Sequence, residues 1–441
     1  MILEKVLERA LGVAEEAEVF QVSSQETPAI FEANRLKSLE TRETTSVALR
    51  IIKGNRIGFA STSNLRDLDA LVEHALEVAP FGPVAHLQFP GKRAYPDVAV
   101  YDAEVASFPV DGLVSLGNDV IRALRTGNPD VLWEGRVSKS VATVSLVNSR
   151  GTEVSYTRTV FAVGMEGLLV QGTDMLFVYE GESSCRPIVD TTPIQSSLEE
   201  QLALARAVVP PVAGPLPVVL TPHGVAGMLL MPLLSGFNGQ TVLQGASPLA
   251  GRLGEKVVDE RITLRDDPTV PYIPGSHPSD DEGVPTTPKP LLDRGVASTF
   301  LYDLQTAAQA GTKSTGNASR WTGAAPSPAA SVLLLQEGDA SYPEMVKDMA
   351  EGLVVERLLG AGQSNVLAGD FHANVLLGYR VSKGKVLGRV KDTMISGNVY
   401  QVLNNLLGIG KASRWIGGWF KTPALYCGSL SVTARPRRDG P

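Results

Sequence analysis

The amino-acid sequence predicts an α+β fold divided into two domains. The chain has 441 residues, more than a single hydrophobic core normally serves. Helical and strand patterns are mixed along it, and 43 glycines and 29 prolines mark many turns. The strongest break in composition is Pro210-Pro211-Val212-Ala213-Gly214-Pro215-Leu216-Pro217. We therefore place an N-terminal domain at residues 1–209 and a C-terminal domain at residues 210–441.

The N-terminal domain begins with an amphipathic helix. Apolar residues from Ile2 to Ala14 recur at helical spacing, which predicts one buried face. Strands are predicted at residues 18–24, 29–36, 44–52 and 56–61, with a tight turn at 53–55 between the last two. A second helix, capped by Asn64, carries apolar residues from Leu65 to Ala79 and stops at Pro80. Helix, strands and helix together indicate an α+β lobe.

Residues 80–109 interrupt this pattern with several prolines, and we interpret them as an extended linker. A helix is predicted near 111–126, ended by Gly127-Asn128-Pro129. The run from 131 to 179 is rich in β-branched residues, and turns at 148–151 and 172–174 predict an antiparallel meander. A helix at 193–208 ends the domain.

The C-terminal domain starts with a short buried strand at 218–220 and an apolar helix at 224–235. Pro232 predicts a break or kink in that helix. A turn and a strand follow at 252–264, and a hairpin folds about Ser382-Lys383-Gly384 between 374–381 and 385–391. The last predicted elements are a helix at 399–407 and a closing strand at 424–434.

Charge and cysteine content argue against several classes of function. The formal net charge is −7, with 40 basic and 47 acidic residues, so no global field favours nucleic acid or anionic lipid. Cys185 and Cys427 form no disulfide framework and no metal or redox spacing, which indicates a reducing cytoplasm. Glu4 and Lys5 interrupt the apolar run that an export signal needs. The most apolar window, 224–234, is about half of the ~20 residues of a membrane span.

No pattern predicts catalysis by this chain alone. A zinc peptidase needs two histidines about one helical turn apart with a glutamate, and the five histidines here are scattered. The cluster Asp280-Asp281-Glu282 after His277 offers ligands or a raised pKa, but the preferred interpretation is a solvated acidic turn. Lys313-Ser314 suggests a serine-lysine nucleophile. The preferred interpretation of Thr315-Gly316-Asn317 is a capped turn or a loop that binds a peptide backbone.

Several short motifs give the chain a family likeness over nearly its whole length. They are Gly245-Ala246-Ser247-Pro248, Gly251-Arg252-Leu253-Gly254-Glu255, Asp281-Glu282-Gly283-Val284-Pro285, Leu291-Leu292-Asp293-Arg294-Gly295-Val296, Ser314-Thr315-Gly316-Asn317, Ile395-Ser396-Gly397-Asn398 and Thr422-Pro423-Ala424-Leu425. With these motifs the sequence resembles the TldD/PmbA family, formerly called modulators of DNA gyrase. The resemblance implies two lobes, an α+β N-terminal lobe and a β-rich, barrel-like C-terminal lobe, assembled as a dimer.

The resemblance also places this chain in one branch of that family. The metallopeptidase branch carries His-Glu-x-x-x-His on the helix after the strand that matches 217–220. Here Met231 and Pro232 stand at the His-Glu pair and Gly236 at the second histidine. These residues cannot bind zinc as that branch does. The chain therefore resembles the TldE/PmbA branch, a pseudoenzyme subunit without a cofactor of its own, and zinc is expected in a TldD-like partner.

We expect five residues to form the wall of a cleft that positions a peptide or the partner chain: Asp281, Glu282, Ser314, Thr315 and Asn317. The expected partners are a TldD-like zinc peptidase chain or a second copy of this chain, and the expected substrate is an unfolded peptide. Two alternatives remain open at this stage. One is an autonomous hydrolase that uses Lys313, Ser314 or the acidic cluster, and the other is a non-enzymatic binding or scaffold protein.

Overall fold

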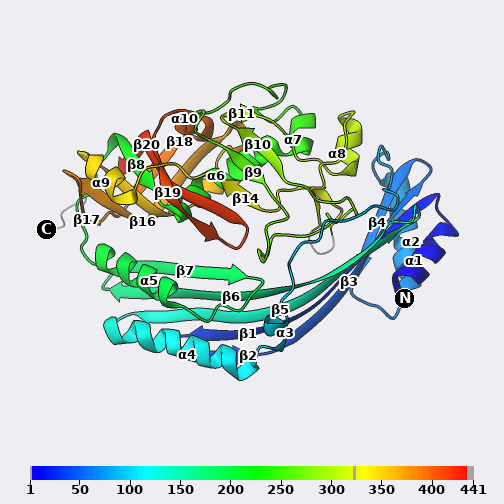
Figure 1. Ribbon diagram of the computed structural model, residues 1–441, viewed down its shortest axis with the longest axis horizontal. Coiled ribbons are helices and arrows are strands. Elements are labelled where there is room, and N and C mark those ends of the chain that lie inside the picture. Colours follow the sequence, from blue (N-terminus) through cyan, green and yellow to red (C-terminus); the bar gives the residue numbers. More distant parts are fainter. Residues whose placement is uncertain (1, 321–323, 435–441) are drawn as a thin grey trace.

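The N-terminal half folds into a long, curved sheet of seven strands (Figure 1). The computed structural model describes residues 2–320 and 324–434. The strand order is β4-β3-β1-β5-β6-β7, with β2 paired to β1, and all pairings are antiparallel. The strands are β1 (Glu16–Glu32), β2 (Arg35–Leu39), β3 (Arg42–Lys53), β4 (Arg56–Thr62), β5 (Leu132–Asn148), β6 (Glu153–Gln171) and β7 (Asp174–Ser184).

Helices cover one face of this sheet, and the alternation of side chains along each strand determines which residues they bury. Ala17 and Val19 of β1 pack against the apolar stripes of the first two helices. Because neighbouring side chains in a strand point to opposite faces, Glu18 and Phe20 are directed toward the C-terminal half. The helices of this half are α1 (Ile2–Leu11), α2 (Leu68–Val78), α3 (Ala103–Ser107), α4 (Val110–Gly127) and α5 (Thr192–Ala205).

Two local predictions for this half are wrong. The strands predicted at 18–24 and 29–36 are one strand, β1, which continues through Pro28 and turns only at Ala33-Asn34. Pairing with β3 ends at Glu26 and pairing with β2 begins at Ala29, so the proline lies where β5 is the paired neighbour. The cap of α2 is Asp67, whose carboxylate accepts the Ala70 N–H at 3.1 Å, and not Asn64.

Most of residues 82–102 have no regular secondary structure, as predicted for the linker at 80–109. The linker is nevertheless packed, since Leu87, Phe89, Val98 and Val100 are buried, and helix α3 within it was not predicted. The turns predicted at 148–151 and 172–174 are confirmed, and the strands they join are longer than their most apolar segments suggested. The seven-stranded sheet and the eleven-stranded sheet lie on opposite sides of residue 210 in the sequence. The proposed boundaries of the two domains stay a prediction.

The C-terminal half is built on a closed barrel. Strands β8, β15, β16, β18 and β20 follow one another in the sheet, and β20 also pairs with β8, which closes the ring. These strands are β8 (Gly214–Leu220), β15 (Glu351–Leu359), β16 (Asp370–Ser382), β18 (Thr393–Asn398) and β20 (Phe420–Ala434). The other strands of this half are β9 (Leu264–Asp266), β10 (Lys289–Asp293), β11 (Val296–Ala297), β12 (Ala318–Ser319), β13 (Ser327–Pro328), β14 (Leu333–Leu335), β17 (Lys385–Arg389) and β19 (Leu406–Ile416). The predicted α+β class with a barrel-like C-terminal lobe is confirmed.

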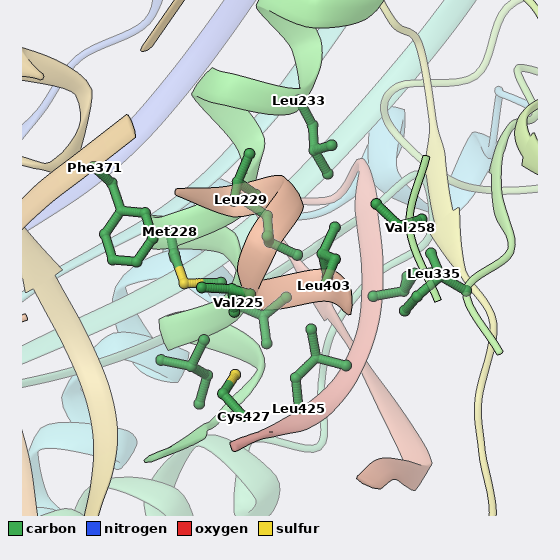
Figure 2. Close-up of a cluster of buried hydrophobic side chains, with 14 of the residues drawn as sticks. Val225, Met228, Leu229, Leu233, Val258, Leu335, Phe371, Leu403, Leu425 and Cys427 are labelled. Carbon is green, nitrogen blue, oxygen red and sulfur yellow. The ribbon is translucent and has the colours of Figure 1, made fainter. Parts of the chain in front are cut away.

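Helix α6 (Pro222–Phe237) fills the apolar core of this half. Figure 2 shows Met228, Leu229 and Leu233 of α6 among side chains that include Phe371 and Leu425 from the strands. The helix continues through Pro232, so the predicted break is wrong. The ring of Pro232 is itself buried, and apolar residues on both sides of it are held in one core, which stabilises the helix despite the lost backbone hydrogen bond.

Four short helices complete the half: α7 (Gly239–Leu243), α8 (Leu304–Gln309), α9 (Tyr342–Asp348) and α10 (Val399–Asn404). Helix α9 was not predicted, although Ser341 and Glu344 form the capping box that marks its start. None of the helices in the described ranges is long and apolar enough to cross a membrane.

Candidate functional site

A cavity of about 720 Å³ lies where β6 of the N-terminal sheet faces the C-terminal lobe. Arg158 of β6 forms one wall, and Met231 and Ser235 of α6 form another. Loop residues around Ala330 and Trp419 complete the lining. The C-terminal half therefore supplies most of the lining and Arg158 contributes from the N-terminal sheet, so the cavity lies between the two lobes, a usual location of a binding site.

A second cavity, of about 250 Å³, adjoins the first on the side of the N-terminal sheet. The two cavities share six lining residues, namely Arg158, Gly275, Ser319, Ala329, Ala330 and Ser331. The smaller cavity is closed by Phe20, Val144 and Tyr156 from three neighbouring strands, and Asp281 and Arg320 also line it. We call the two cavities together the interlobe cleft.

Buried charges beside the cleft connect the two lobes. Arg50 of β3 lies opposite Glu18 of β1 in the sheet, and the two ion-pair at 3.1 Å. The Nη1 atom of Arg50 also donates to Glu282 Oε1 at 2.5 Å, across 232 positions of sequence. Glu18 is in turn paired with Arg320. All four side chains are at most 3% exposed, so this network of two acids and two arginines is nearly free of solvent.

The turn that carries Glu282 is held by Asp280. Its Oδ1 atom accepts the backbone N–H groups of Glu282 and Val284 at 3.0 and 2.9 Å, and its Oδ2 atom accepts that of Ala318 at 3.1 Å. Burial and the neighbouring Glu282 charge raise the pKa of Asp280 well above its ordinary value. The acidic cluster is thus a buried turn that contacts the N-terminal lobe through Glu282, and the prediction of a solvated turn is wrong.

The structure places the five predicted cleft residues in different surroundings. Asp281 lines the smaller cavity, and its Oδ2 atom accepts the Arg320 N–H at 2.7 Å. Asn317 lines the same cavity and is 2% exposed. Glu282 is fully buried, and its second oxygen accepts the N–H of Leu304 at the start of α8, at 2.6 Å.

Ser314 and Thr315 lie outside the interlobe cleft. Both hydroxyls donate to the carbonyl oxygen of Tyr302, at 3.2 and 3.1 Å, and the Thr315 hydroxyl also accepts the Tyr302 N–H. Ser314 lines a separate cavity of about 680 Å³, beside Lys313. The two hydroxyls thus anchor the loop that leads into Asn317. Peptide or partner contact by the five residues stays a prediction.

The three positions matched to the zinc motif lie on the part of α6 next to the larger cavity. Met231 is 54% exposed and lines it, whereas Pro232 is buried. Gly236 faces Tyr400, and a Cβ atom at Gly236 would lie 2.1 Å from the tyrosine hydroxyl oxygen. These residues do not fit a zinc ion. Within residues 2–320 and 324–434, no group of three or more His, Cys, Asp or Glu side chains is placed to hold a metal ion.

His277 gives the smaller cavity a pH-dependent component. Burial lowers the pKa of His277 to about 4, and the nearby Arg158 lowers it further, while Asp266 opposes the shift. Its ring nitrogens lie 3.0 Å from the Gly275 carbonyl oxygen and 3.3 Å from the Ser331 hydroxyl. A neutral ring satisfies both contacts, as donor to the carbonyl and acceptor from the hydroxyl.

We expect this histidine to destabilise the fold in acid. Its folded pKa lies below the ordinary value of 6.5, so the unfolded chain takes up the proton first as the pH falls. The stability that neutral His277 contributes above pH 6.5 is therefore lost between about pH 6.5 and 4. The measurement is the free energy of unfolding from pH 8 to 4 for the wild type and for His277→Gln. Parallel curves would contradict the assignment, because the variant should fall less steeply in that window.

Sequence reasoning missed the arginines that define the cleft. Arg50 stands between buried residues in β3, and Arg158 stands beside the buried Thr159 in β6. A charged residue on the buried face of a strand is the available signal, since such a charge is rarely buried unless it is paired or binds something. Arg320 was missed as well, because its partner Glu18 lies 302 positions earlier in the sequence.

The two-lobed fold has a solved representative. This chain is similar in structure to TldE from Thermococcus kodakarensis, whose crystal structure superposes with a TM-score of 0.88 at 23% sequence identity. The superposition covers 98% of this chain and 100% of the TldE chain. Residues 213–434 match the PmbA/TldA metallopeptidase C-terminal domain, and residues 17–79 match domain 1 of the same metallopeptidases. The chain therefore belongs to the TldD/PmbA metallopeptidase family, as the motifs indicated.

Two relatives show how far the sequence likeness extends. An uncharacterized protein from Methanocaldococcus jannaschii is 26% identical over 413 residues, which cover 92% of this chain and 94% of that protein. A metalloprotease from Methanothermobacter thermautotrophicus is 30% identical over 296 residues, 64% of each chain. These similarities support membership of a peptidase family.

Proposed function

We propose that this chain is a TldE/PmbA-like subunit of a cytoplasmic, two-chain metallopeptidase. In this role it carries no zinc motif, forms one side of the chamber for an unfolded peptide, and relies on a TldD-like partner for zinc and for cleavage. The interlobe cleft receives part of the extended peptide. A second copy of the chain is the alternative partner.

The observation that carries the proposal is the composition of α6 at the larger cavity. The helix still lines a cavity of about 720 Å³ built by both lobes, as a peptide-binding subunit requires. At the positions where the peptidase branch carries its ligands, however, this chain has a thioether, a buried proline ring and a glycine. None of these side chains can polarise a peptide carbonyl or activate water in the manner of a zinc peptidase.

The test is co-expression with a paralogue that contains His-Glu-x-x-x-His, followed by a peptide-degradation assay of each chain alone and of the mixture. We expect co-purification, zinc in the paralogue, and cleavage that increases when both chains are present. Metal-free cleavage by the isolated chain at the rate of the mixture would support an autonomous hydrolase. Capture of another protein without any peptidase activity would support the scaffold alternative.

A double variant tests the loop that leads to the cleft. Replacing Ser314 and Thr315 with alanine removes the anchors on Tyr302 and should shift Asn317, so peptide processing by the complex should fall by up to about 100-fold. Circular dichroism and thermal unfolding should still show a folded chain. The matched control replaces Ser145 and Ser155, two hydroxyls 2.8 Å apart on the other face of β5 and β6 from Val144. Unchanged processing in the Ser314 and Thr315 variant would count against the loop's role.

A further inference from the structure

The smaller part of the interlobe cleft contains an unusual unpaired cation. Arg158 lines both cavities. It forms no hydrogen bond or ion pair with any other residue in the described part of the chain. A half-buried guanidinium group loses hydrogen bonds to water, and here no protein hydrogen bond replaces them. Arg158 is therefore a candidate for binding an anion.

Two buried groups in the same wall have unused hydrogen-bonding capacity. The Arg320 side chain is 3% exposed, donates to Glu18 and to the Asp281 carbonyl oxygen, and lies over the Phe20 ring, but its Nη1 atom has no partner among the described residues. Asn317 donates to Asp266 at 2.6 Å, while its Oδ1 atom likewise has no partner within the described ranges. Both atoms are inaccessible to solvent, so the wall beside the cavity holds one buried donor and one buried acceptor without a partner among the described residues.

The charged groups around the smaller cavity leave the donors of one arginine unused. Among the described residues, Asp281 is the carboxylate that lines it, and that carboxylate is already bound by the Arg320 N–H. Arg50 and Arg320 are balanced by Glu18 and Glu282, and His277 is neutral near pH 7. Arg158 acts on Asp281 through space, but it makes no ion pair or hydrogen bond with any described residue, so its N–H donors are unused. A carboxylate is the anion that matches its planar, two-pronged donor geometry.

We propose that the smaller cavity binds a carboxylate group of the substrate peptide. Arg158 receives the carboxylate, and the rest of the peptide extends into the larger cavity, which Arg158 also lines. This inference rests on the proposed function, because it identifies the feature of the peptide that the subunit recognises. The carboxylate comes either from the peptide C-terminus or from an acidic side chain.

The experiment measures the binding of fluorescent, unstructured peptides to the complex and to this chain alone. One pair differs only in a free or an amidated C-terminus, and a second, amidated pair differs only in an internal Asp or Asn. We expect the carboxylate member of one pair to bind about tenfold more tightly than its neutral twin, and that pair identifies the source. Equal affinities within both pairs would overturn the proposal.

Variants at Arg158 assign the effect to this cavity. Arg158→Gln should abolish the preference for the carboxylate, and Arg158→Lys should restore part of it, whereas Arg122→Gln on the exposed face of α4 is the control. Because Arg158 makes no ion pair, its replacement should leave the unfolding midpoint unchanged. Peptide cleavage without any carboxylate preference would contradict carboxylate binding in the smaller cavity and would leave the proposed subunit role intact. A carboxylate preference without cleavage would support carboxylate binding and contradict the subunit role.

Discussion

Arg50→Met should lower the free energy of unfolding by about 3–5 kcal/mol, the usual effect of removing one partner from a buried ion pair. Arg50 binds Glu18 and Glu282, both fully buried. Methionine fills a similar volume but leaves Glu282 with no cation in contact. Burial already raises the pKa of Glu282, and the charge of Arg50 opposes that rise. The measurement is denaturant unfolding followed by two probes.

The matched control is Arg136→Met, because Arg136 also pairs with a glutamate, Glu26, but both side chains are more than 40% exposed. That variant should change stability by less than about 1 kcal/mol. The double variant Arg50→Met with Glu282→Gln should recover part of the loss, since it removes the stranded charge as well. A loss near that of the control would show that the buried network does not hold the lobes together.

Helices and turns were predictable from the sequence where residues close to one another in the chain determine them. The apolar stripes of α1 and α2, and the turns at 148–151 and 172–174, depend on residues close in sequence. Errors arose where tertiary packing prevailed over a local preference. Pro28 is tolerated inside β1, and Pro232 inside α6, because packing and strand pairing outweigh the lost backbone hydrogen bond.

The closure of the barrel could not be predicted from the residues alone. β20 pairs with β8 although more than 200 residues separate Leu425 from its partner Leu220, and no period or spacing specifies such a pairing. The expectation of a barrel-like lobe came from the family likeness, and the structure confirms it. The register between distant strands is decided by the whole core.

The candidate site was predictable only in part for the same reason. The polar residues of the loops led us to expect Asp281 and Asn317 in a cleft wall, and both line the smaller cavity. The same reasoning predicted an accessible Glu282, whereas its carboxylate is buried and accepts a hydrogen bond from Arg50 of the N-terminal lobe. The nature of the cleft depends on Arg158, which stands in a long strand and meets the loops only after folding.

Restoring the zinc motif on α6 should not produce a zinc peptidase. The variant Met231→His, Pro232→Glu, Gly236→His contains the residues of the motif. The histidine at position 236, however, would clash with the side chain of Tyr400. A Cβ atom at Gly236 would lie 2.1 Å from the tyrosine hydroxyl oxygen, far inside van der Waals contact. Overpacking of this kind costs about 1–3 kcal/mol and displaces the helix or the tyrosine. We expect no stoichiometric zinc in the purified variant by elemental analysis, and tight zinc binding would contradict this steric argument.

A smaller substitution isolates that contact. Gly236→Ala should destabilise the wild type by about 1–3 kcal/mol through its clash with Tyr400. In the Tyr400→Phe background the hydroxyl is absent, and the next atoms lie 3.4 Å or more from the new methyl group. Alanine is favoured over glycine inside a helix by about 0.5–1 kcal/mol, so the same substitution should then become neutral or stabilising. The Tyr400 hydroxyl has no hydrogen-bond partner among the described residues, so Tyr400→Phe itself should cost little. An equal cost of Gly236→Ala in both backgrounds would show that another contact keeps this position small.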